Sequence, residues 1–490
     1  MFLNRVIEVF GKYPDRNAFC INDEFYTYRE LAEKVGSIQN NIAQISDQRI
    51  GIVTGNELET YASILAVLLS LKTYVPINPG HPAERNGQVI VQAGISILLS
   101  TERTNDYPAI NVIATRNLPH NKEEVAYKNS EIEASDTDAY ILFTSGSTGI
   151  PKGVPISYYN LDSFINAFIG LGYEVSESDR FLQMFDLTFD LSIFSYLVPL
   201  CFGACVYTIS DSGMKYTNVY NVLESYQITV ALMVPSMLLS LRPYFNEITL
   251  PELRYSLFCG EALFKDVATE WMQCVPNATV VNVYGPTEAT IFCTVYELSD
   301  KDNVSSYNEV VSIGHTMEGT EAIVIDEHGE IITDNTKGEL CLHGDQLTKG
   351  YLDDAKNKAA FVKLNDKRYY RTGDIVYKDG NGNFMYCGRA DQQVKIQGYR
   401  IELSEIEYHL RLITGSANIV VLAVTRAGAL ASLEAVYDDG RVDEDLVMAE
   451  LRTKLPAYMM PLKMHFVAAF PLNANGKTDR NALKKMIDPL

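Results

Sequence analysis

Short, uninterrupted apolar runs recur along the first 390 residues, with helical patterns between them. The runs lie at residues 50–54, 95–99, 139–143 and 280–284, and each has the length of a buried strand. Between the first two runs, residues 61–71 predict an apolar helix, and an earlier helix begins at Thr27, where Glu30 completes a capping box. Buried strands that alternate with helices predict an α/β architecture.

The pattern changes near Gly380, where a turn cluster at residues 378–383 precedes shorter elements. They are a helix that a second capping box opens at Ser404, strands at residues 418–424, 433–437 and 464–467, and a helix at residues 444–455. Since 490 residues with 47% hydrophobic side chains exceed what one core accommodates, we expect two domains. The first, residues 1–390, is a large domain of stacked α/β subdomains, and the second, residues 391–490, is a small mobile α+β domain.

The composition excludes several classes of partner. A net charge of −21 argues against nucleic acids and anionic membranes. No apolar run reaches the length of a membrane span, and the first residues lack the basic start and the cleavage site of a signal peptide. The eight cysteines form no CxxC pair, so we expect buried free thiols in a reducing compartment rather than zinc ligands or disulfides. We therefore expect a cytoplasmic monomer without membrane insertion.

The strongest local motif is LFTSGSTGIPKG at residues 142–153, in which a buried strand runs into a loop of small and hydroxyl residues. Glycines allow backbone N–H groups to approach phosphate oxygens, hydroxyls add donors, and a lysine adds a positive charge. The spacing is not that of a Walker A motif, and a flexible solvent-exposed loop is the alternative interpretation. The candidate phosphate-binding residues are Thr144, Ser145, Gly146, Ser147, Thr148, Gly149 and Lys152.

Two further motifs carry groups that suit a nucleotide. NVYGPTEAT at residues 282–290 ends a strand in a Gly-Pro turn that presents Tyr284 for stacking on a base and Glu288 for holding Mg²⁺. The alternative is an ordinary helix start, because proline is common at the first helical position. YRTGD at residues 370–374 places Asp374 after a glycine turn, where a carboxylate can accept both hydroxyls of a ribose. Alone, this pentapeptide is a weak signal.

The last two motifs are GRADQQVKIQGYRIELSEIE at residues 388–407 and PLNANGKTDR at residues 471–480, in which Lys477 sits in a glycine turn. Alone, such a lysine is more often solvated than functional. The five motifs occur in the order found in the adenylate-forming superfamily, which includes peptide-synthetase adenylation domains, acyl-CoA ligases and luciferases. The sequence resembles this superfamily over essentially its whole length.

The resemblance implies a ligase that uses ATP and Mg²⁺ to form an acyl-adenylate and then a thioester. In the superfamily the loop at residues 144–152 cradles the ATP phosphates, and Lys477 bridges the substrate carboxylate and the α-phosphate, where an ammonium stabilises the developing charge. The other nucleotide contacts that it implies are Tyr284 to adenine, Thr287 to the α-phosphate, Glu288 to Mg²⁺, Asp374 to the ribose, and Arg389 near the ribose and phosphate.

The resemblance also implies a hinge at Asp391. The small domain is then expected to rotate between two states, one that brings Lys477 into the site for adenylation and one that brings the Gly398 segment in for thioester formation. Since the sequence ends soon after Lys477, we expect the thiol to come from a separate carrier protein with a phosphopantetheine arm.

The substrate class depends on FDLTFDLSIF at residues 185–194, which contains Phe-Asp-Leu twice. When the second copy is aligned with the superfamily, Asp190 matches the aspartate that binds the α-ammonium of an amino acid, and a buried carboxylate needs such a partner. The alternatives are that Asp190 caps a helix or that Asp186 is the anchor. The pocket residues implied by the same alignment are Leu191, Phe194, Leu232, Leu257, Cys259, Val283, Ile291 and Phe292.

The implied pocket is apolar apart from the Cys259 thiol, which indicates a small aliphatic amino acid. The sequence around Cys259 and Tyr284 is most similar to the D-alanine–carrier protein ligases, so D-alanine is favoured, although Phe194 and the repeated Phe-Asp-Leu depart from their pattern. L-Alanine, proline, valine and cysteine stay open as substrates. The competing functions are a carboxylate–CoA ligase and a catalytically silent nucleotide-binding scaffold, and the intact ATP motifs argue against the scaffold.

Overall fold

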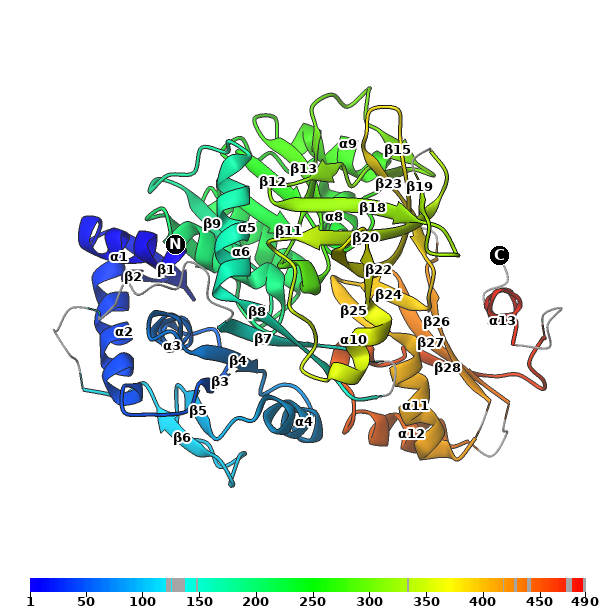
Figure 1. Ribbon diagram of the computed structural model, residues 1–490, viewed down its shortest axis with the longest axis horizontal. Helices are drawn as coiled ribbons and strands as arrows, with labels where there is room; N and C mark the ends of the chain where they lie inside the picture. Colours follow the sequence, from blue (N-terminus) through cyan, green and yellow to red (C-terminus); the bar gives the residue numbers. More distant parts are fainter. Residues whose placement is uncertain are drawn as a thin grey trace.

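The computed structural model describes residues 1–119, 125, 137–146, 149–332, 335–416, 418–426, 430–438, 442–472 and 478–487. It combines helices with parallel and antiparallel sheets, which confirms the predicted α/β class (Figure 1). The elements after residue 390 lie together at one side of the larger part, next to α4 (Ala83–Ala93) (Figure 1).

The first sheet belongs to the N-terminal third of the chain. Its strand order is β6 (Asn111–Ala114), β5 (Ile97–Ser100), β3 (Arg49–Val53), β4 (Thr73–Ile77), β7 (Asp138–Thr144) and β8 (Lys152–Ser157). The pairs are parallel except for β7 and β8, which are antiparallel neighbours on either side of the phosphate-loop motif. The helices of this region are α2 (Tyr28–Ile42), α3 (Leu58–Leu69), α4 and α5 (Tyr158–Gly170).

The second sheet is larger and is parallel through its centre. Its order is β17 (His315–Thr316), β14 (Thr294–Leu298), β13 (Thr279–Tyr284), β12 (Tyr255–Phe258), β11 (Val230–Met233), β9 (Arg180–Gln183), β10 (Cys205–Thr208), β1 (Asn17–Ile21) and β2 (Glu24–Thr27). The helices along these strands are α1 (Phe2–Lys12), α6 (Asp190–Leu200), α7 (Lys215–Ser225), α8 (Pro235–Leu241) and α9 (Lys265–Cys274). One continuous hydrophobic core joins this sheet to the first.

An antiparallel sheet follows and carries the YRTGD motif. It contains β18 (Thr320–Ile325), β19 (Ile331–Ile332), β20 (Gly338–Gly344), β21 (Phe361–Leu364), β22 (Lys367–Lys378) and β23 (Phe384–Arg389). In the β22–β23 pair, Asp374 lies directly opposite Arg389. This register brings two of the predicted nucleotide residues side by side.

The elements after residue 390 surround a separate hydrophobic core. They are the hairpin β24 (Gln393–Ile396) and β25 (Tyr399–Glu402), helix α11 (Leu403–Thr414), the strands β26 (Ile419–Val424), β27 (Ser432–Tyr437) and β28 (Lys463–Phe466), and the helices α12 (Glu444–Leu451) and α13 (Arg480–Ile487). A separate hydrophobic core is a feature of a separate domain, and its movement as a unit stays a prediction. The boundary at residue 390 and the hinge at Asp391 stay predictions.

The two predicted capping boxes have different outcomes. The box at Thr27 and Glu30 is confirmed, because each side chain bonds the backbone N–H of the other. The box at Ser404 is wrong, because α11 begins at Leu403 and its N-cap residue, Glu402, donates its backbone N–H to the Ser145 hydroxyl at 3.2 Å. That hydroxyl comes from the phosphate-loop motif, so a long-range contact sets the start of this helix.

Two predictions concerned the state of the cysteines and the possibility of a membrane span. All eight cysteines are free thiols, and seven of them are buried, as expected. Within the described ranges, no helix has both the length and the apolar character to cross a membrane.

Candidate active site

A cavity lies where the carboxyl ends of strands from two sheets meet. Ligands of open α/β sheets bind at such an edge, outside the carboxyl ends of the strands. The cavity lining includes Thr144 and Ser145 after β7, the segment 185–191 after β9, Cys259 and Gly260 after β12, and residues 285–287 after β13. Asp374, Arg389 and the β24–β25 hairpin close the remaining side. Four of the five motifs therefore contribute to one site.

The predicted ribose residue Asp374 is buried in a network of hydrogen bonds. The Tyr284 hydroxyl donates to its Oδ2 at 2.5 Å, and Arg389 Nη1 lies 2.8 Å from its Oδ1. Burial, together with the adjacent Asp374, raises the pKa of Tyr284 well above its ordinary value. Lys395 Nζ lies 5.4 Å from the centre of the Tyr284 ring. Asp374 and Arg389 line the cavity, whereas Tyr284 is not among its lining residues, so its stacking on a base stays a prediction.

The phosphate-loop motif contributes donors to the same cavity. Thr144 Oγ1 is buried and has no hydrogen-bond partner among the residues that the structure describes, although Thr144 lines the cavity. A buried hydroxyl without a partner fits a site whose ligand supplies the missing acceptor. Gly149 has a φ of +76°, which a side chain would strain, and burial lowers the pKa of Lys152. Ser147 and Thr148 lie outside the described residues.

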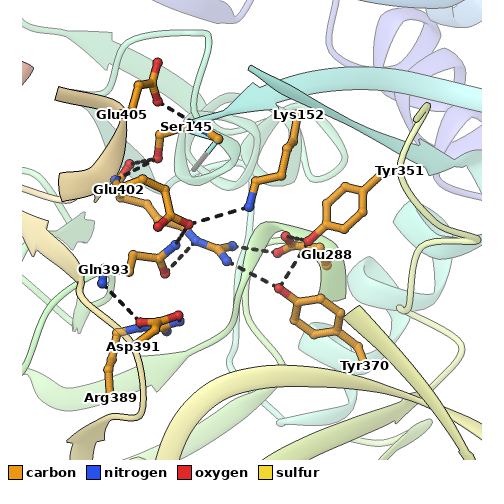
Figure 2. A network of polar contacts seen from close by, with 12 residues as sticks. Ser145, Lys152, Glu288, Tyr351, Tyr370, Arg389, Asp391, Gln393, Glu402 and Glu405 are labelled. Atoms are coloured by element: carbon orange, nitrogen blue, oxygen red, sulfur yellow. Dashed lines mark hydrogen bonds and ion pairs between the residues drawn. The ribbon is translucent and has the colours of Figure 1, made fainter. Parts of the chain in front are cut away.

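Glu288 is fully buried and faces two partners (Figure 2). Arg400 Nη1 lies 2.8 Å from its Oε2, and the Tyr351 hydroxyl donates to its Oε1 at 2.6 Å. Burial alone would raise the pKa of Glu288, but these partners outweigh it and lower that pKa to about 2. The group is therefore a permanent carboxylate that requires a cation.

A carboxylate of this kind fits a magnesium ion that is shared with a nucleotide. Mg²⁺ is held in phosphoryl-transfer sites by one or two carboxylates and by the phosphates themselves. Among the described residues, no group of three or more His, Cys, Asp or Glu side chains forms a cage of protein ligands. In this arrangement Arg400 is the cation that contacts Glu288.

Asp190 is the first residue of α6 and lines the cavity. Its side chain is 8% exposed, and burial raises its pKa to about 6, in spite of a hydrogen bond from the Thr287 side chain. The helix has no side-chain cap bond, so Asp190 does not act as a cap. The Asp186 carboxylate, the alternative anchor, already has partners within the protein. It accepts hydrogen bonds from the Thr188 N–H and hydroxyl, both at 2.8 Å, and from the Asn78 side chain.

The apolar residues predicted for the substrate pocket fall into two groups. Leu191 and Cys259 line the cavity itself. The others are buried, and the Phe194 ring packs against the rings of Phe168, Phe181 and Phe292. The buried residues without a place in the cavity lining are Phe194, Leu232, Leu257, Val283, Ile291 and Phe292. Their contact with a substrate stays a prediction.

The β24–β25 hairpin enters the cavity from the C-terminal part. Gly398, at its turn, has a φ of +82°, and a Cβ there would lie 2.5 Å from Val234 Cγ1. Only glycine permits this close approach, which places the turn beside the predicted substrate residues. Lys477 lies outside the described residues, so its position in the site stays a prediction.

The sequence analysis assigned no separate role to several residues of the site. Arg400, Glu402 and Glu405 stand inside the fourth motif, but charges on a helix start usually indicate a solvated face. Arg85 forms an ion pair with Glu405, 320 positions away, and Tyr351 lies between β20 and the helix at Asp354–Ala360. No local pattern marks either one.

Comparisons with known proteins show the family of the chain. The family model of the AMP-binding enzymes matches residues 7–352. A D-alanine–D-alanyl carrier protein ligase of Bacillus licheniformis is 33% identical, and the match covers 99% of each chain.

Two solved structures extend the likeness to the whole fold. The Vibrio cholerae adenylation domain AlmE, solved with glycyl-adenosine-5'-phosphate, has a TM-score of 0.89 and 28% identity over 100% of this chain and 98% of that one. Holo-PA1221, a peptide-synthetase protein with adenylation and carrier domains, has a TM-score of 0.85 and 27% identity over 98% and 83% of the two chains.

Proposed function

The chain belongs to the AMP-binding enzymes, and from that membership we propose that it activates a small amino acid with ATP and passes the aminoacyl group to the phosphopantetheine thiol of a separate carrier protein. D-Alanine is the favoured substrate, since the B. licheniformis relative is named for it and matches over nearly its full length. A carrier protein as partner has the same support, together with the adenylation and carrier domains of PA1221.

The proposal that the substrate is an amino acid rests on the burial of Asp190 in the cavity. A carboxylate that is almost fully buried in a ligand cavity requires a cation, and the α-ammonium of an amino acid supplies one. Its hydrogen bond with Thr287 ties it to the motif proposed for the α-phosphate. An acyl-CoA ligase that takes a simple carboxylic acid has no use for such a group.

The proposed chemistry has two steps. The substrate carboxylate attacks the α-phosphorus, a new P–O bond forms, and pyrophosphate leaves with the electrons of the broken bond. The carrier thiolate then attacks the acyl carbon, and AMP leaves. Glu288 is the residue that would hold Mg²⁺, and a bound Mg²⁺ would supply positive charge for the leaving pyrophosphate. Lys477 is proposed to stabilise the approach of the two anions, and rotation at Asp391 is proposed to separate the steps.

The testing experiment is amino-acid-dependent ATP–pyrophosphate exchange with both enantiomers of the common amino acids and with glycine. We expect the largest response with D-alanine. A response to simple carboxylic acids and to no amino acid would overturn the assignment of Asp190 and leave a carboxylate–CoA ligase.

Glycine is the second candidate, because of the aromatic cluster behind the cavity. The ring centroids of Phe194 and Phe292 are 5.6 Å apart, and those of Phe194 and Phe168 are 5.1 Å apart, so little room remains beyond Leu191 and Cys259. AlmE, solved with glycyl-adenosine-5'-phosphate, resembles this chain over its whole length. A response to glycine that exceeds the response to D-alanine would favour this candidate.

Replacing Cys259 with glycine should widen the pocket. Removing the side chain from the cavity wall leaves space for about one or two further carbon atoms, and each is worth roughly 10-fold or more in discrimination. We expect exchange with larger amino acids to rise about tenfold relative to alanine. The matched control is Cys341→Gly, a buried cysteine of β20 away from the cavity. If the substrate profile of exchange changes equally in both variants, Cys259 does not contact the substrate.

The pH dependence of substrate binding should report Asp190. Its pKa in the free protein is raised to about 6 by burial, so the carboxylate is charged above pH 6 and neutral below it. The KM for the amino acid should rise about tenfold for each pH unit below 6 and level off above 7. The measurement is the exchange rate against amino-acid concentration from pH 5 to 8. A KM that stays constant over this range contradicts the role of Asp190.

A further inference from the structure

The C-terminal part contacts the phosphate-loop motif through two consecutive elements, β25 and α11 (Figure 2). The Ser145 hydroxyl donates to the Arg400 carbonyl of β25 at 2.8 Å and accepts the Glu402 N–H at 3.2 Å. The Gly146 N–H donates to the Glu405 side chain in α11 at 3.0 Å. A Cβ on Gly149 would lie 2.6 Å from Tyr408 of the same helix. The loop is therefore contacted at Ser145, Gly146 and Gly149, whereas Thr144 still lines the cavity.

Two of these contacts place carboxylates on groups that suit phosphates. Glu405 Oε2 accepts the Gly146 N–H, and Glu402 Oε1 lies 3.6 Å from Lys152 Nζ. Backbone N–H groups of a glycine loop and a lysine ammonium are the donors that bind phosphate oxygens in proteins. The two acids supply oxygens and negative charge to those same donors.

The Glu405 carboxylate is fixed from behind by Arg85. Arg85 Nη1 lies 2.8 Å from Glu405 Oε1, and the side chains are 6% and 0% exposed. Arg85 belongs to α4 of the N-terminal part, so the pair crosses between the two parts of the molecule. A buried pair of this kind is costly to break from one side, because the remaining charge loses its partner without gaining water.

At Glu288 the C-terminal part supplies a cation, where at the phosphate loop it supplies carboxylates. Arg400 contacts the carboxylate oxygen at 2.8 Å, and Glu288 is the residue proposed to hold the metal of the nucleotide. The nucleoside end of the cavity differs, because residues 285–287 and Asp374 still line open space. The C-terminal part thus covers the outer phosphate region and leaves the nucleoside region accessible.

We propose that Glu402 and Glu405 occupy the positions of the outer phosphates, so that docking of the C-terminal part and binding of pyrophosphate exclude each other. The inference rests on the proposed function in taking residues 144–152 as the phosphate loop. It makes Glu402, Glu405 and Arg85 positioning residues for the transfer step. While this arrangement lasts, an adenylate in the cavity is shielded from pyrophosphate, and the first step does not reverse.

Mutual exclusion predicts the direction of changes in affinity. A ligand that binds only the undocked protein has an apparent affinity reduced by the undocked fraction. Substitutions that weaken docking therefore strengthen pyrophosphate binding, even when they remove no contact with it. Binding of AMP, which uses the accessible nucleoside region, should hardly change.

The experiment is calorimetric titration of the full chain with inorganic pyrophosphate in excess Mg²⁺, and separately with AMP. We expect Glu405→Gln and Arg85→Gln each to bind magnesium pyrophosphate about tenfold more tightly than the unaltered protein, and AMP within about twofold. The matched control is Glu84→Gln. Glu84 forms an ion pair with Lys454 between the same two parts, 2.7 Å apart, away from the phosphate loop. Because this pair is exposed, its loss should weaken docking very little, and both affinities should stay within about twofold of those of the unaltered protein.

The two main variants distinguish two causes of a change in pyrophosphate affinity, namely weaker docking and a direct effect of the lost charge. Losing an acid beside the loop would favour an anion, and losing an arginine would disfavour it, so a direct charge effect moves the affinities in opposite directions. Tighter binding by both supports competition. Weaker binding by Arg85→Gln, or unchanged binding by Glu405→Gln, overturns the proposal.

A substitute variant and the comparison of the two ligands decide the remaining cases. If Arg85→Gln does not fold, Arg85→Lys keeps the charge, loses the paired geometry and should shift the affinity in the same direction by a smaller factor. The titrations need no amino acid, so they do not depend on the substrate. AMP binding with no change for pyrophosphate overturns this inference alone, whereas a chain that binds neither ligand overturns the proposed function.

Discussion

Asp190→Asn should lower amino-acid-dependent ATP–pyrophosphate exchange by about 10²–10³-fold while leaving AMP binding within about twofold. The substitution keeps the shape of the side chain and removes the charge. An ammonium buried without its counter-charge costs about 3–5 kcal/mol, which corresponds to a loss on the order of 10²–10³-fold or more in kcat/KM. The variant should also lose the dependence of KM on pH below 6. Exchange kinetics over a range of amino-acid concentrations measure both effects.

Asp186→Asn is the matched control for this prediction. Its carboxylate already closes a turn with Thr188, so the loss should stay below about tenfold. If Asp186→Asn loses exchange and Asp190→Asn keeps it, the anchor of the substrate is the first Phe-Asp-Leu copy.

Lys477→Ala should lower the rate of adenylate formation by about 10²–10³-fold, the effect of removing one preorganised stabiliser of transition-state charge. ATP binding should persist, because the phosphate loop, Asp374 and Arg389 remain. Transfer from a preformed adenylate should also persist, since that step is assigned to the other arrangement of the C-terminal part. Single-turnover measurements of each half-reaction distinguish these outcomes. Lys484→Ala, an exposed lysine of α13, is the control, and unchanged adenylation in Lys477→Ala would end its proposed role.

The sequence predicted the strands and the strand-end motifs because both depend on neighbouring residues. The apolar runs became β3, β5, β7 and β13 to within two residues at each end. Thr144 ends β7 and Thr287 follows β13, and the carboxyl ends of these strands meet in one cavity. Cys259 follows β12, a strand that the sequence analysis did not predict. The local pattern and the arrangement of the sheets agree at these positions.

Contacts between distant segments set the features that the sequence did not reveal. Ser404 has the spacing of a capping residue, yet the hydroxyl of Ser145 meets the first N–H of that helix. Glu405 has the pattern of a solvated acid in a first helical turn, but it is fully buried against Arg85. The depth of the pocket likewise depends on how Phe168, Phe181 and Phe292 fill the space behind Phe194. None of these neighbours is close in sequence.

The Cys259 thiol on the wall of the cavity has a consequence for self-modification. An acyl-adenylate acylates any thiolate within reach, and the proposed reaction would form one beside this residue. Burial raises the pKa of Cys259 to about 12, so the thiolate fraction at pH 7 is on the order of 10⁻⁵. The thiol then packs against the substrate without attacking it. The enzyme can therefore hold an activated acyl group beside its own sulfur and remain unmodified until the thiol of another protein arrives.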